Sequence, residues 1–373
     1  MRFPEFSGEW EEHTLSEYLE FKNGLNPDAK RIGSGLPFIS VMDILSEGVI
    51  NYDNIRGKVN ATEKEIECFG VKDGDLLFQR SSETLEDVGR ANVYMDNRTA
   101  IYGGFVIRGR KIGNYDPLFF KYLLATPLAR KRTCRMGAGA QHFNIGQEGL
   151  SKISLYFPSI EEQRKIAEFL SLIDERIATQ NKIIEDLKKL KSAISERLLK
   201  GVKGSTVLLS DICDIVKGKQ INGENLSESG NYYVMNGGTE LSGYYDDYNV
   251  EANTISISEG GNSCGYVQFN TSPFWSGGHC YSIQDITDNV DNLYLYHYLK
   301  SKEDAIMKLR IGSGLPNIQK KDLAMFKIKI PAVEQQLKIS TFLSSLERKA
   351  EIEERIQNAL LKEKQYLLHQ MFI

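Results

Sequence analysis

Two stretches of the chain carry apolar residues at the seven-residue spacing of a long packed helix. Pro158-Ser159 predicts the start of the first helix, and Gly201 predicts its end. The two interleaved registers of this helix consist of Leu170, Ile177, Ile184, Lys191 and Leu198, and of Ile166, Ile173, Gln180, Leu187 and Ile194. The pattern predicts the a/d seam of a coiled coil over more than four heptads.

A second helix of this kind follows Pro331, with polar interruptions at Glu353 and Glu363. Its apolar positions are Ile339, Phe342, Leu343, Leu346, Ile356, Leu360 and Leu367. The two helices can form a coiled coil between separate chains, or an antiparallel pair within one chain. We favour the antiparallel pair, because the nearest partner for an exposed apolar seam is the other helix of the same chain. Gln180 and Lys191 would then be polar positions that set the register.

The segments before each helix have a different pattern. They are rich in Gly, Tyr, Asn and Ser, and their short apolar runs at residues 104–107, 253–258 and 265–269 predict strands. Asp116 and Asp291 each open an apolar stretch typical of a short buried helix capped by an aspartate. We therefore predict an α+β protein with mixed domains at residues 1–157 and 205–330, separated by the long helices at 158–204 and 331–373.

The chain also repeats itself. Arg135-Met136-Gly137-Ala138-Gly139 returns 175 positions later as Arg310-Ile311-Gly312-Ser313-Gly314, and Glu161-x-Gln163 returns 173 positions later as Glu334-x-Gln336. Such an internal repeat predicts two related halves. Together with antiparallel helices, it predicts two variable domains at opposite ends of a rod, related by an approximate two-fold axis. Duplex DNA has the same symmetry.

Composition narrows the classes of function. The formal net charge is −4, so binding to nucleic acid requires a local basic patch or basic partners. The five cysteines are scattered and none forms a C-x-x-C pair, which favours free thiols in a reducing compartment over a metal site or disulfides. No apolar run reaches the roughly 18 residues of a membrane span, and Met1-Arg2-Phe3-Pro4 does not start a signal peptide. We expect a cytoplasmic protein without a membrane segment.

Motifs of common catalysts are missing from the sequence. There is no G-x-x-x-x-G-K-[ST] loop, no dinucleotide-binding glycine motif after a strand, and no H-E-x-x-H pair. No pair of acidic residues is followed by the E-x-K spacing of a common nuclease core, and the Asn-Pro-Pro-aromatic stretch of base methylation is also missing. The five histidines are isolated, so no metal site is predicted. The chain is therefore not expected to be a catalyst by itself.

Several segments resemble one family. They are Arg2-Phe3-Pro4-Glu5-Phe6-x-Gly8-Glu9-Trp10, Pro158-x-x-Glu161-Glu162-Gln163-x-Lys165-Ile166-Ala167, its echo Pro331-x-x-Glu334-Gln335-Gln336-x-Lys338-Ile339, and Phe274-Trp275-Ser276-Gly277-Gly278-His279. The chain resembles the specificity subunits of type I restriction–modification systems over its whole length and in the same order. The helix start that occurs twice is the most specific element of this resemblance.

The resemblance implies a function and partners. Each target recognition domain would read one half of an asymmetric split site in double-stranded DNA, and the helices would set the gap and bind two modification subunits. Glu161, Gln163, Glu334 and Gln336 are the predicted partner-binding residues. The modification subunits would carry S-adenosylmethionine, and restriction subunits would carry ATP and Mg²⁺, leaving no cofactor in this chain. The alternatives are a methylation-only system, a coiled-coil scaffold without DNA, and a single-chain restriction enzyme; the missing motifs argue against the last.

Candidate DNA-binding residues lie where apolar strands give way to polar loops. Arg80 can pair with a guanine or a phosphate, or be a solvated surface arginine, and Glu259 can accept from a cytosine amino group. The candidates around these two residues are Arg80, Ser81, Ser82 and Arg90 in the first domain, and Ser258, Glu259 and Asn262 in the second.

The most basic segment of the chain ends in a glycine loop, which suits phosphate contact, although a solvated helix end gives the same pattern. Its candidate residues are Lys131, Arg135, Gln141 and His142, with Arg310, Ser313 and Asn317 in the counterpart. Further loop candidates in the second domain are Lys217, Lys219, Asn236 and His279.

Overall fold

A computed structural model describes residues 2–312, 314 and 316–372. The chain forms two compact units. The first contains the residues up to Asn181 and those from Ile356 onward, and the second is Lys182–Arg355. Each unit therefore contains one mixed α/β part and a portion of both long helices, α6 (Ile160–Lys200) and α10 (Val333–Met371). The α+β class is confirmed, and the domain boundaries at 157, 204 and 330 stay a prediction.

The main sheet of the first unit is antiparallel, in the order β2-β10-β6-β8. These strands are Leu19–Asn23, Val106–Lys111, Leu76–Gln79 and Ala91–Val93. Helices α3 (Pro117–Ala125), α4 (Pro127–Cys134) and α5 (Gln147–Ser151) accompany it, and β1 (Glu11–Thr14) pairs with β12 (Ser154–Phe157). Phe78, Phe119 and Phe120 are fully buried in the core between sheet and helices.

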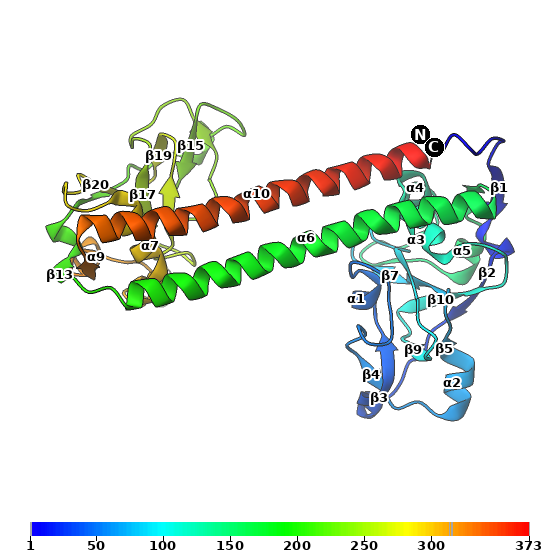
Figure 1. Ribbon diagram of the computed structural model, residues 1–373. Coiled ribbons are helices and arrows are strands. Elements are labelled where there is room, and N and C mark those ends of the chain that lie inside the picture. Colours follow the sequence, from blue (N-terminus) through cyan, green and yellow to red (C-terminus); the bar gives the residue numbers. More distant parts are fainter. Residues whose placement is uncertain (1, 313, 315, 373) are drawn as a thin grey trace. The chain divides into compact units, whose positions relative to one another are not determined.

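The first unit also has a smaller sheet, in the order β4-β3-β9-β5, with a core of its own around Ile39 and Tyr102. Its strands are Lys58–Val59, Ile32–Ile39, Ala100–Tyr102 and Gly70–Val71, and its helices are α1 (Val41–Ile44) and α2 (Glu63–Phe69). Within this unit, β3, β4 and α2 lie on the side remote from α6 (Figure 1). Short 3-10 turns occur at Leu15–Glu17 and Ala29–Arg31.

The second unit repeats the main sheet, in the order β14-β20-β17-β18. These strands are Asp214–Lys217, Cys280–Gln284, Thr254–Ser258 and Val267–Asn270. The paired strands β13 (Ser205–Leu208) and β21 (Lys327–Ile330) correspond to β1 and β12. The other elements are α7 (Asn292–Ser301), α8 (Glu303–Met307), α9 (Lys320–Ala324), β15 (Tyr232–Met235), β16 (Tyr244–Tyr245), β19 (Phe274–Ser276), and 3-10 turns at Leu209–Asp211 and Gly223–Asn225.

The internal repeat is confirmed by this shared strand order and by the helix caps. The Asp116 carboxylate accepts from the backbone N–H of Phe119 at 2.8 Å, and the Asp291 carboxylate accepts from that of Tyr294 at the same distance. Both aspartates cap a buried helix, as the sequence predicts, because a side-chain oxygen at this position satisfies one of the free N–H groups of the first turn.

The long helices pair antiparallel inside each unit. In the first unit, Asp174 of α6 contacts Lys364 of α10, and Asn181 contacts Gln357. In the second unit, Lys188 contacts Glu354, and Lys191 contacts Glu347. In each case residue numbers rise along α6 while they fall along α10. The predicted antiparallel pair is therefore confirmed, and the predicted a/d positions of α6 are buried or half-buried.

The seam predicted for α10 needs a correction. Phe342 and Ile356 are exposed by 45% and 39% and lie outside the contact with α6. The covered positions continue the seven-residue spacing of Ile339, Leu346, Glu353, Leu360 and Leu367, and of Leu343, Ala350, Gln357, Lys364 and Met371. Glu353 belongs to this seam, whereas Glu363 is exposed. The prediction failed because it ranked positions by apolarity, while the period along the helix decides which positions face the partner.

Within residues 2–312, 314 and 316–372, no helix is long and apolar enough to cross a membrane. The cysteines are all free thiols, and Cys213, Cys264 and Cys280 are buried.

A buried histidine should make the second unit sensitive to acid. His297 of α7 is 3% exposed, its Nε2 lies 2.9 Å from the Ser344 hydroxyl of α10, and burial lowers its pKa to about 4. An unfolded histidine has a pKa near 6.5, so the unfolded chain binds the proton more tightly. Stability is therefore present above about pH 6.5 and is lost as pH falls from there towards 4, by about 3 kcal/mol.

We expect the His297→Gln variant to lose this part of the pH dependence. Denaturant unfolding of both proteins at pH 7 and about pH 4.5 measures it. The same loss of stability in both proteins would show that other groups cause the acid sensitivity.

Candidate nucleic-acid interface

Three segments of the first unit meet where β6 ends. They are Arg80–Ser82, the turn at Phe105, and residues 138–144, and together we call them the first loop edge. β7 (Ser81–Ser82) pairs with β11 (Phe143–Asn144), and the Ser81 hydroxyl contacts the Asn144 side chain. Ala138 and Asn144 bond across the glycine loop through both backbone groups at 2.9 Å. The structure thus brings together two candidate segments that lie about sixty residues apart in sequence.

The second unit contains the same arrangement. Ser258 ends β17, Glu259 and Gly260 follow it, His279 precedes β20, and Ile311 and Asn317 lie at the two ends of the glycine loop. Together we call these residues the second loop edge. Ile311 and Asn317 bond across the loop at 2.8 and 3.0 Å, and Gly260 bridges to Asn317. Ser313 lies outside the described residues.

Backbone hydrogen bonds match the two edges residue by residue. Arg80 N donates to Phe105 O and Glu259 N to His279 O, both at 2.9 Å. The carbonyl of Arg80 accepts from Ile145 N at 3.0 Å, and that of Glu259 accepts from Ile318 N at 2.8 Å. Arg80 and Glu259 therefore occupy the same place in the two halves, with opposite charge.

These bonds correct the alignment of the glycine loops. The residues that close the loops are Ala138 and Ile311, 173 positions apart, and their partners Asn144 and Asn317 have the same offset. The sequence alignment at an offset of 175 paired Arg135 with Arg310, but these arginines are not equivalent. Arg135 caps the C-terminus of α4, whereas Arg310 directly precedes the closing residue. Between the capping aspartate and the residue that closes the loop, the second half is two residues shorter than the first. The Arg-x-Gly-x-Gly pattern in both halves hid this difference in the sequence alignment.

The basic and polar candidates of the first unit are mostly at the surface. Lys131, Arg135, Gln141 and His142 are exposed, and the last two lie in the glycine loop. The exposed Arg90 pairs with Asp87 at 2.6 Å, and the half-buried Arg80 donates to the Gly104 carbonyl at 3.3 Å. Their DNA contacts stay a prediction.

In the second unit, the exposed candidates are Lys217, Lys219, Asn262, His279, Arg310 and Asn317. Asn236 is half-buried, and its side-chain oxygen accepts from His279 N at 3.2 Å. The Ser258 hydroxyl is buried and contacts backbone carbonyls, among them that of Gly260 at 3.3 Å. Ser258 therefore supports the edge from within the fold.

Glu259 has partners inside the protein and little exposed surface. It is 8% exposed, its Oε1 accepts from Lys217 Nζ at 2.6 Å, and the Tyr281 hydroxyl lies 3.2 Å away. Burial, and next the Glu259 carboxylate, raise the pKa of Tyr281 to about 12, so this hydroxyl keeps its proton and can donate it. The predicted contact between Glu259 and a cytosine amino group is untested.

Sequence reasoning missed Phe105. It is 68% exposed, although most phenylalanines are buried, and it holds the same place at the first edge as His279 does at the second. The matched Gly103-Gly104 and Gly277-Gly278 directly before these residues are the sequence signal that could have found it. An exposed ring beside Arg80 can contact a base face or a thymine methyl group.

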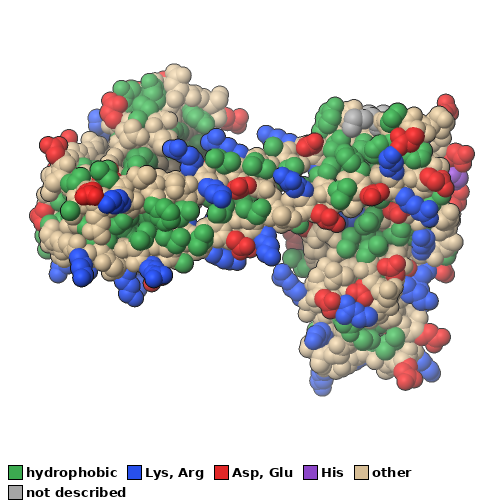
Figure 2. Space-filling model, in the orientation of Figure 1, with side chains coloured by type: hydrophobic (Ala, Val, Ile, Leu, Met, Phe, Trp, Pro, Cys, Tyr) green, Lys and Arg blue, Asp and Glu red, His purple; other side chains and the backbone are tan. Residues whose placement is uncertain are grey.

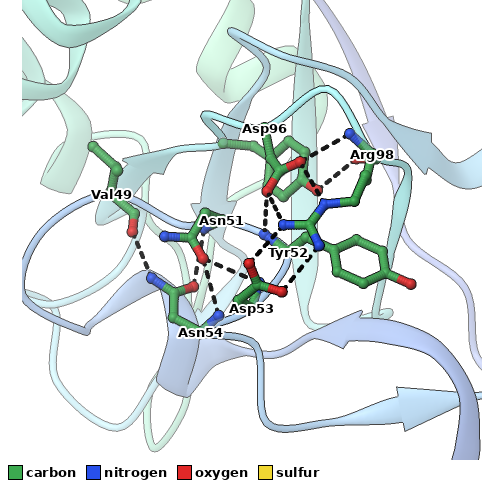
Figure 3. A network of polar contacts seen from close by, with 8 residues as sticks. Val49, Asn51, Tyr52, Asp53, Asn54, Asp96 and Arg98 are labelled. Atoms are coloured by element: carbon green, nitrogen blue, oxygen red, sulfur yellow. Dashed lines mark hydrogen bonds and ion pairs between the residues drawn. The ribbon is translucent and has the colours of Figure 1, made fainter.

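Arg98, which the sequence did not single out, has its charge neutralised by two carboxylates. Arg98 lies between Asp53 and Asp96, with donor–acceptor distances of 2.7–3.0 Å, and its guanidinium stacks 4.3 Å from the Tyr52 ring centre (Figure 3). Arg98 holds the pKa of both aspartates below the usual range. The side-chain oxygens of Asn51 and Asn54 each accept a hydrogen bond from the backbone N–H of the other residue, which closes the same loop. This network fixes a loop and offers no unpaired charge to a phosphate.

The predicted partner-binding residues divide into two kinds. Glu161 and Glu334 are exposed, so binding of a partner there stays a prediction. Gln163 and Gln336 are buried and link each long helix to its domain. Gln163 accepts from Asp116 N at 3.1 Å and donates to Pro158 O at 3.0 Å; Gln336 accepts from Asp291 N at 2.8 Å and donates to Pro331 O at 2.9 Å. The repeated Pro-x-x-Glu-x-Gln motif thus has a structural basis.

Acidic and basic side chains are interspersed on the face shown in Figure 2, in agreement with the small net charge. DNA contact would therefore depend on local features such as the loop edges. In the part of the chain that the structure describes, no cluster of three His, Cys, Asp or Glu side chains could hold a metal ion.

Comparison with known proteins identifies this architecture. The family model "Type I restriction modification DNA specificity domain" matches residues 7–189 and 202–362, so the chain belongs to this family. The type I restriction enzyme MjaVIII specificity subunit of Methanocaldococcus jannaschii is 23% identical over 417 residues, covering 99% of this chain and 92% of that protein.

Solved structures share the fold. The S subunit of a type I restriction–modification system from M. genitalium matches with a TM-score of 0.69 at 19% identity, covering 98% of this chain and 96% of that one. A chain from a study of complex assembly and conformational transition in a type I system matches with a TM-score of 0.60 at 15% identity, with 97% of both chains covered.

Proposed function

We propose that this chain is the DNA sequence-specificity subunit of a type I restriction–modification complex. In this proposal the first loop edge reads one half of a split DNA site and the second loop edge reads the other half. The observation that carries the proposal is the pair of loop edges: they share four matched backbone hydrogen bonds, while Arg80 and Phe105 are replaced by Glu259 and His279. Similar backbones with unlike side chains support an asymmetric site with two different half-sites.

Catalysis in this proposal belongs to the partners. Two modification subunits bring S-adenosylmethionine and the methyl transfer, and restriction subunits bring ATP and Mg²⁺. This chain supplies recognition and spacing, and the exposed starts of α6 and α10, around Glu161 and Glu334, are the proposed docking surfaces. A cytoplasmic location follows from the proposed role.

Reconstitution tests the proposal. The purified chain, the modification subunits and the complex of both are incubated with S-adenosylmethionine and genomic DNA. We expect sequence-specific methylation by the complex alone. Methyl transfer by the isolated chain would make it an enzyme, and a complex without any DNA sequence preference would favour the scaffold alternative.

The spacing role gives a separate prediction. Removing one heptad from the middle of both α6 and α10 keeps the seam in register and shortens the pair by about 10 Å. We expect the gap between the half-sites to shrink by roughly 3 base pairs, since each base pair rises about 3.4 Å. Binding to a set of duplexes with graded gaps measures this. An unchanged preferred gap, with both half-sites still recognised, would refute the spacing role.

A further inference from the structure

Three side chains of the second unit, those of Lys217, Tyr281 and His279, lie around the buried carboxylate of Glu259. Glu259 Oε1 accepts from Lys217 Nζ at 2.6 Å. Glu259 Oε2 is buried as well, but it has no hydrogen-bond partner among the described residues. His279 Nδ1 lies 4.0 Å from this second oxygen, and the side chains of Lys217 and His279 are exposed by 53% and 62%. One oxygen of the buried carboxylate is thus satisfied, and the other lies next to an exposed imidazole.

An unpaired carboxylate oxygen is unfavourable in a buried place, because it has lost its water without gaining a donor. A protonated His279 would supply that donor, since both ring nitrogens of an imidazolium carry a hydrogen. Nδ1 would need to approach Oε2 by about 1 Å to reach hydrogen-bonding distance. The other ring nitrogen would then be free to donate to a second anion.

The neighbours of His279 define its electrostatic surroundings. Glu259, directly after β17, places a negative charge beside the His279 ring, and Lys217 at the end of β14 places a positive charge nearby. Asn236 at the end of β15 accepts from the His279 backbone N–H and is uncharged. Because Lys217 and Glu259 cancel each other, a further negative group beside His279 would tip the balance towards the protonated form. A DNA phosphate is such a group.

The first edge lacks this arrangement. Gly24 N bonds Val106 O at 3.1 Å and Gly218 N bonds Cys280 O at 2.9 Å, so Asn23 stands where the second edge has Lys217. At these matched places Asn23, Arg80 and Phe105 carry one permanent positive charge, whereas the charges of Lys217 and Glu259 cancel each other. A proton on His279 would add a positive charge to the second unit at this place.

We propose that Lys217, Glu259 and His279 form a proton-linked clamp for a DNA backbone phosphate. Glu259 is a positioning residue that holds both cations. His279 takes a proton from solvent when a phosphate arrives, its Nδ1–H pairs with Glu259 Oε2, and its Nε2–H and Lys217 Nζ face the phosphate. The inference rests on the proposed function, because it requires the second edge to face DNA. It assigns Glu259 to the support of a phosphate contact, in place of a base contact.

The test uses the full chain assembled with its modification subunits, and a duplex that carries the methylated motif of this system. Affinity is measured at constant ionic strength from about pH 6 to pH 8. We expect wild-type affinity to fall about five- to tenfold as pH rises through the range in which imidazoles titrate, since one phosphate contact depends on the proton. His279→Gln should bind at every pH as wild type does at pH 8, and His279→Lys should bind tightly throughout.

Two further variants separate the alternatives. His369→Gln, which changes an exposed histidine of α10 outside both loop edges, is the matched control and should keep the wild-type pH dependence. Glu259→Gln should reduce the pH dependence and leave the preferred sequence unchanged. An equal pH dependence of wild type and His279→Gln, or a changed base preference in Glu259→Gln, would overturn the clamp while leaving the proposed function intact. A complex with no preference for its motif at any pH would instead overturn the proposed function.

Discussion

Replacing Arg80 with alanine is expected to weaken binding of the assembled complex to its DNA site about 10- to 100-fold, which corresponds to roughly 1–3 kcal/mol. Arg80 is the charged side chain at the centre of the first loop edge, between the exposed Phe105 and the glycine loop. Its guanidinium donates one hydrogen bond of 3.3 Å to the Gly104 carbonyl. The substitution should therefore cost binding and little folding stability.

The pattern of the loss shows what Arg80 contacts. If Arg80 reads a guanine, the Arg80→Ala complex should tolerate other bases at one position of one half-site. If Arg80 binds a phosphate, affinity should fall by the same factor for all sequences. The slope of log affinity against log salt concentration should then decrease by about one. Lys64→Ala is the control, because Lys64 is exposed on α2 and its loss removes the same charge outside the loop edge. Equal effects of the two substitutions would remove Arg80 from the interface.

Replacing Gln336 with leucine is expected to destabilise the second unit by about 2–4 kcal/mol. The Gln336 side chain is fully buried. It accepts a hydrogen bond from Asp291 N at 2.8 Å and donates to Pro331 O and Asn289 O, both at 2.9 Å. Leucine has a similar volume but no polar group, so these backbone groups would lose their partner. The start of α10 would also lose its connection to the cap of α7.

Hydrogen exchange on the Gln336→Leu variant can locate this loss. Protection should fall in α7 and the start of α10, and the melting temperature of this unit should fall by roughly 5–12 °C. Glu334→Ala is the matched control two residues away, where the exposed side chain pairs with Lys338 at the surface; we expect little change. A similar loss in both variants would mean that the Gln336 contacts contribute no special stability.

The long helices and the repeat could be predicted because their signals are local. The period of α6 and the capping aspartates Asp116 and Asp291 depend on neighbours within a few turns. The seam of α10 was less accurate, because polar residues such as Gln357 and Lys364 occupy seam positions. Counting apolar residues misses these seam positions, whereas the seven-residue period of the helix includes them.

The loop edges could be predicted only in part. Residues 31–37 and 310–316 have the same seven letters, Arg-Ile-Gly-Ser-Gly-Leu-Pro. Residues 32–37 of the first copy lie in β3, where Ile32 and Leu36 both pair with Val59. Arg31, directly before β3, forms an ion pair with Glu65. In the second copy, Ile311 closes a loop onto Asn317. Because the partner strands differ, local sequence did not decide which copy would belong to an edge. Burial of Glu259 against Lys217 and Tyr281 likewise depends on residues distant in sequence.

The central claim is that one chain reads two unlike half-sites at a fixed spacing. Mapping of methylated bases across the genome, in strains with and without this chain, tests that claim most directly. We predict one methylated motif that depends on the chain and consists of two different short sequences around a gap of constant length. A motif that is continuous, or a methylation map that is the same in both strains, would contradict the account.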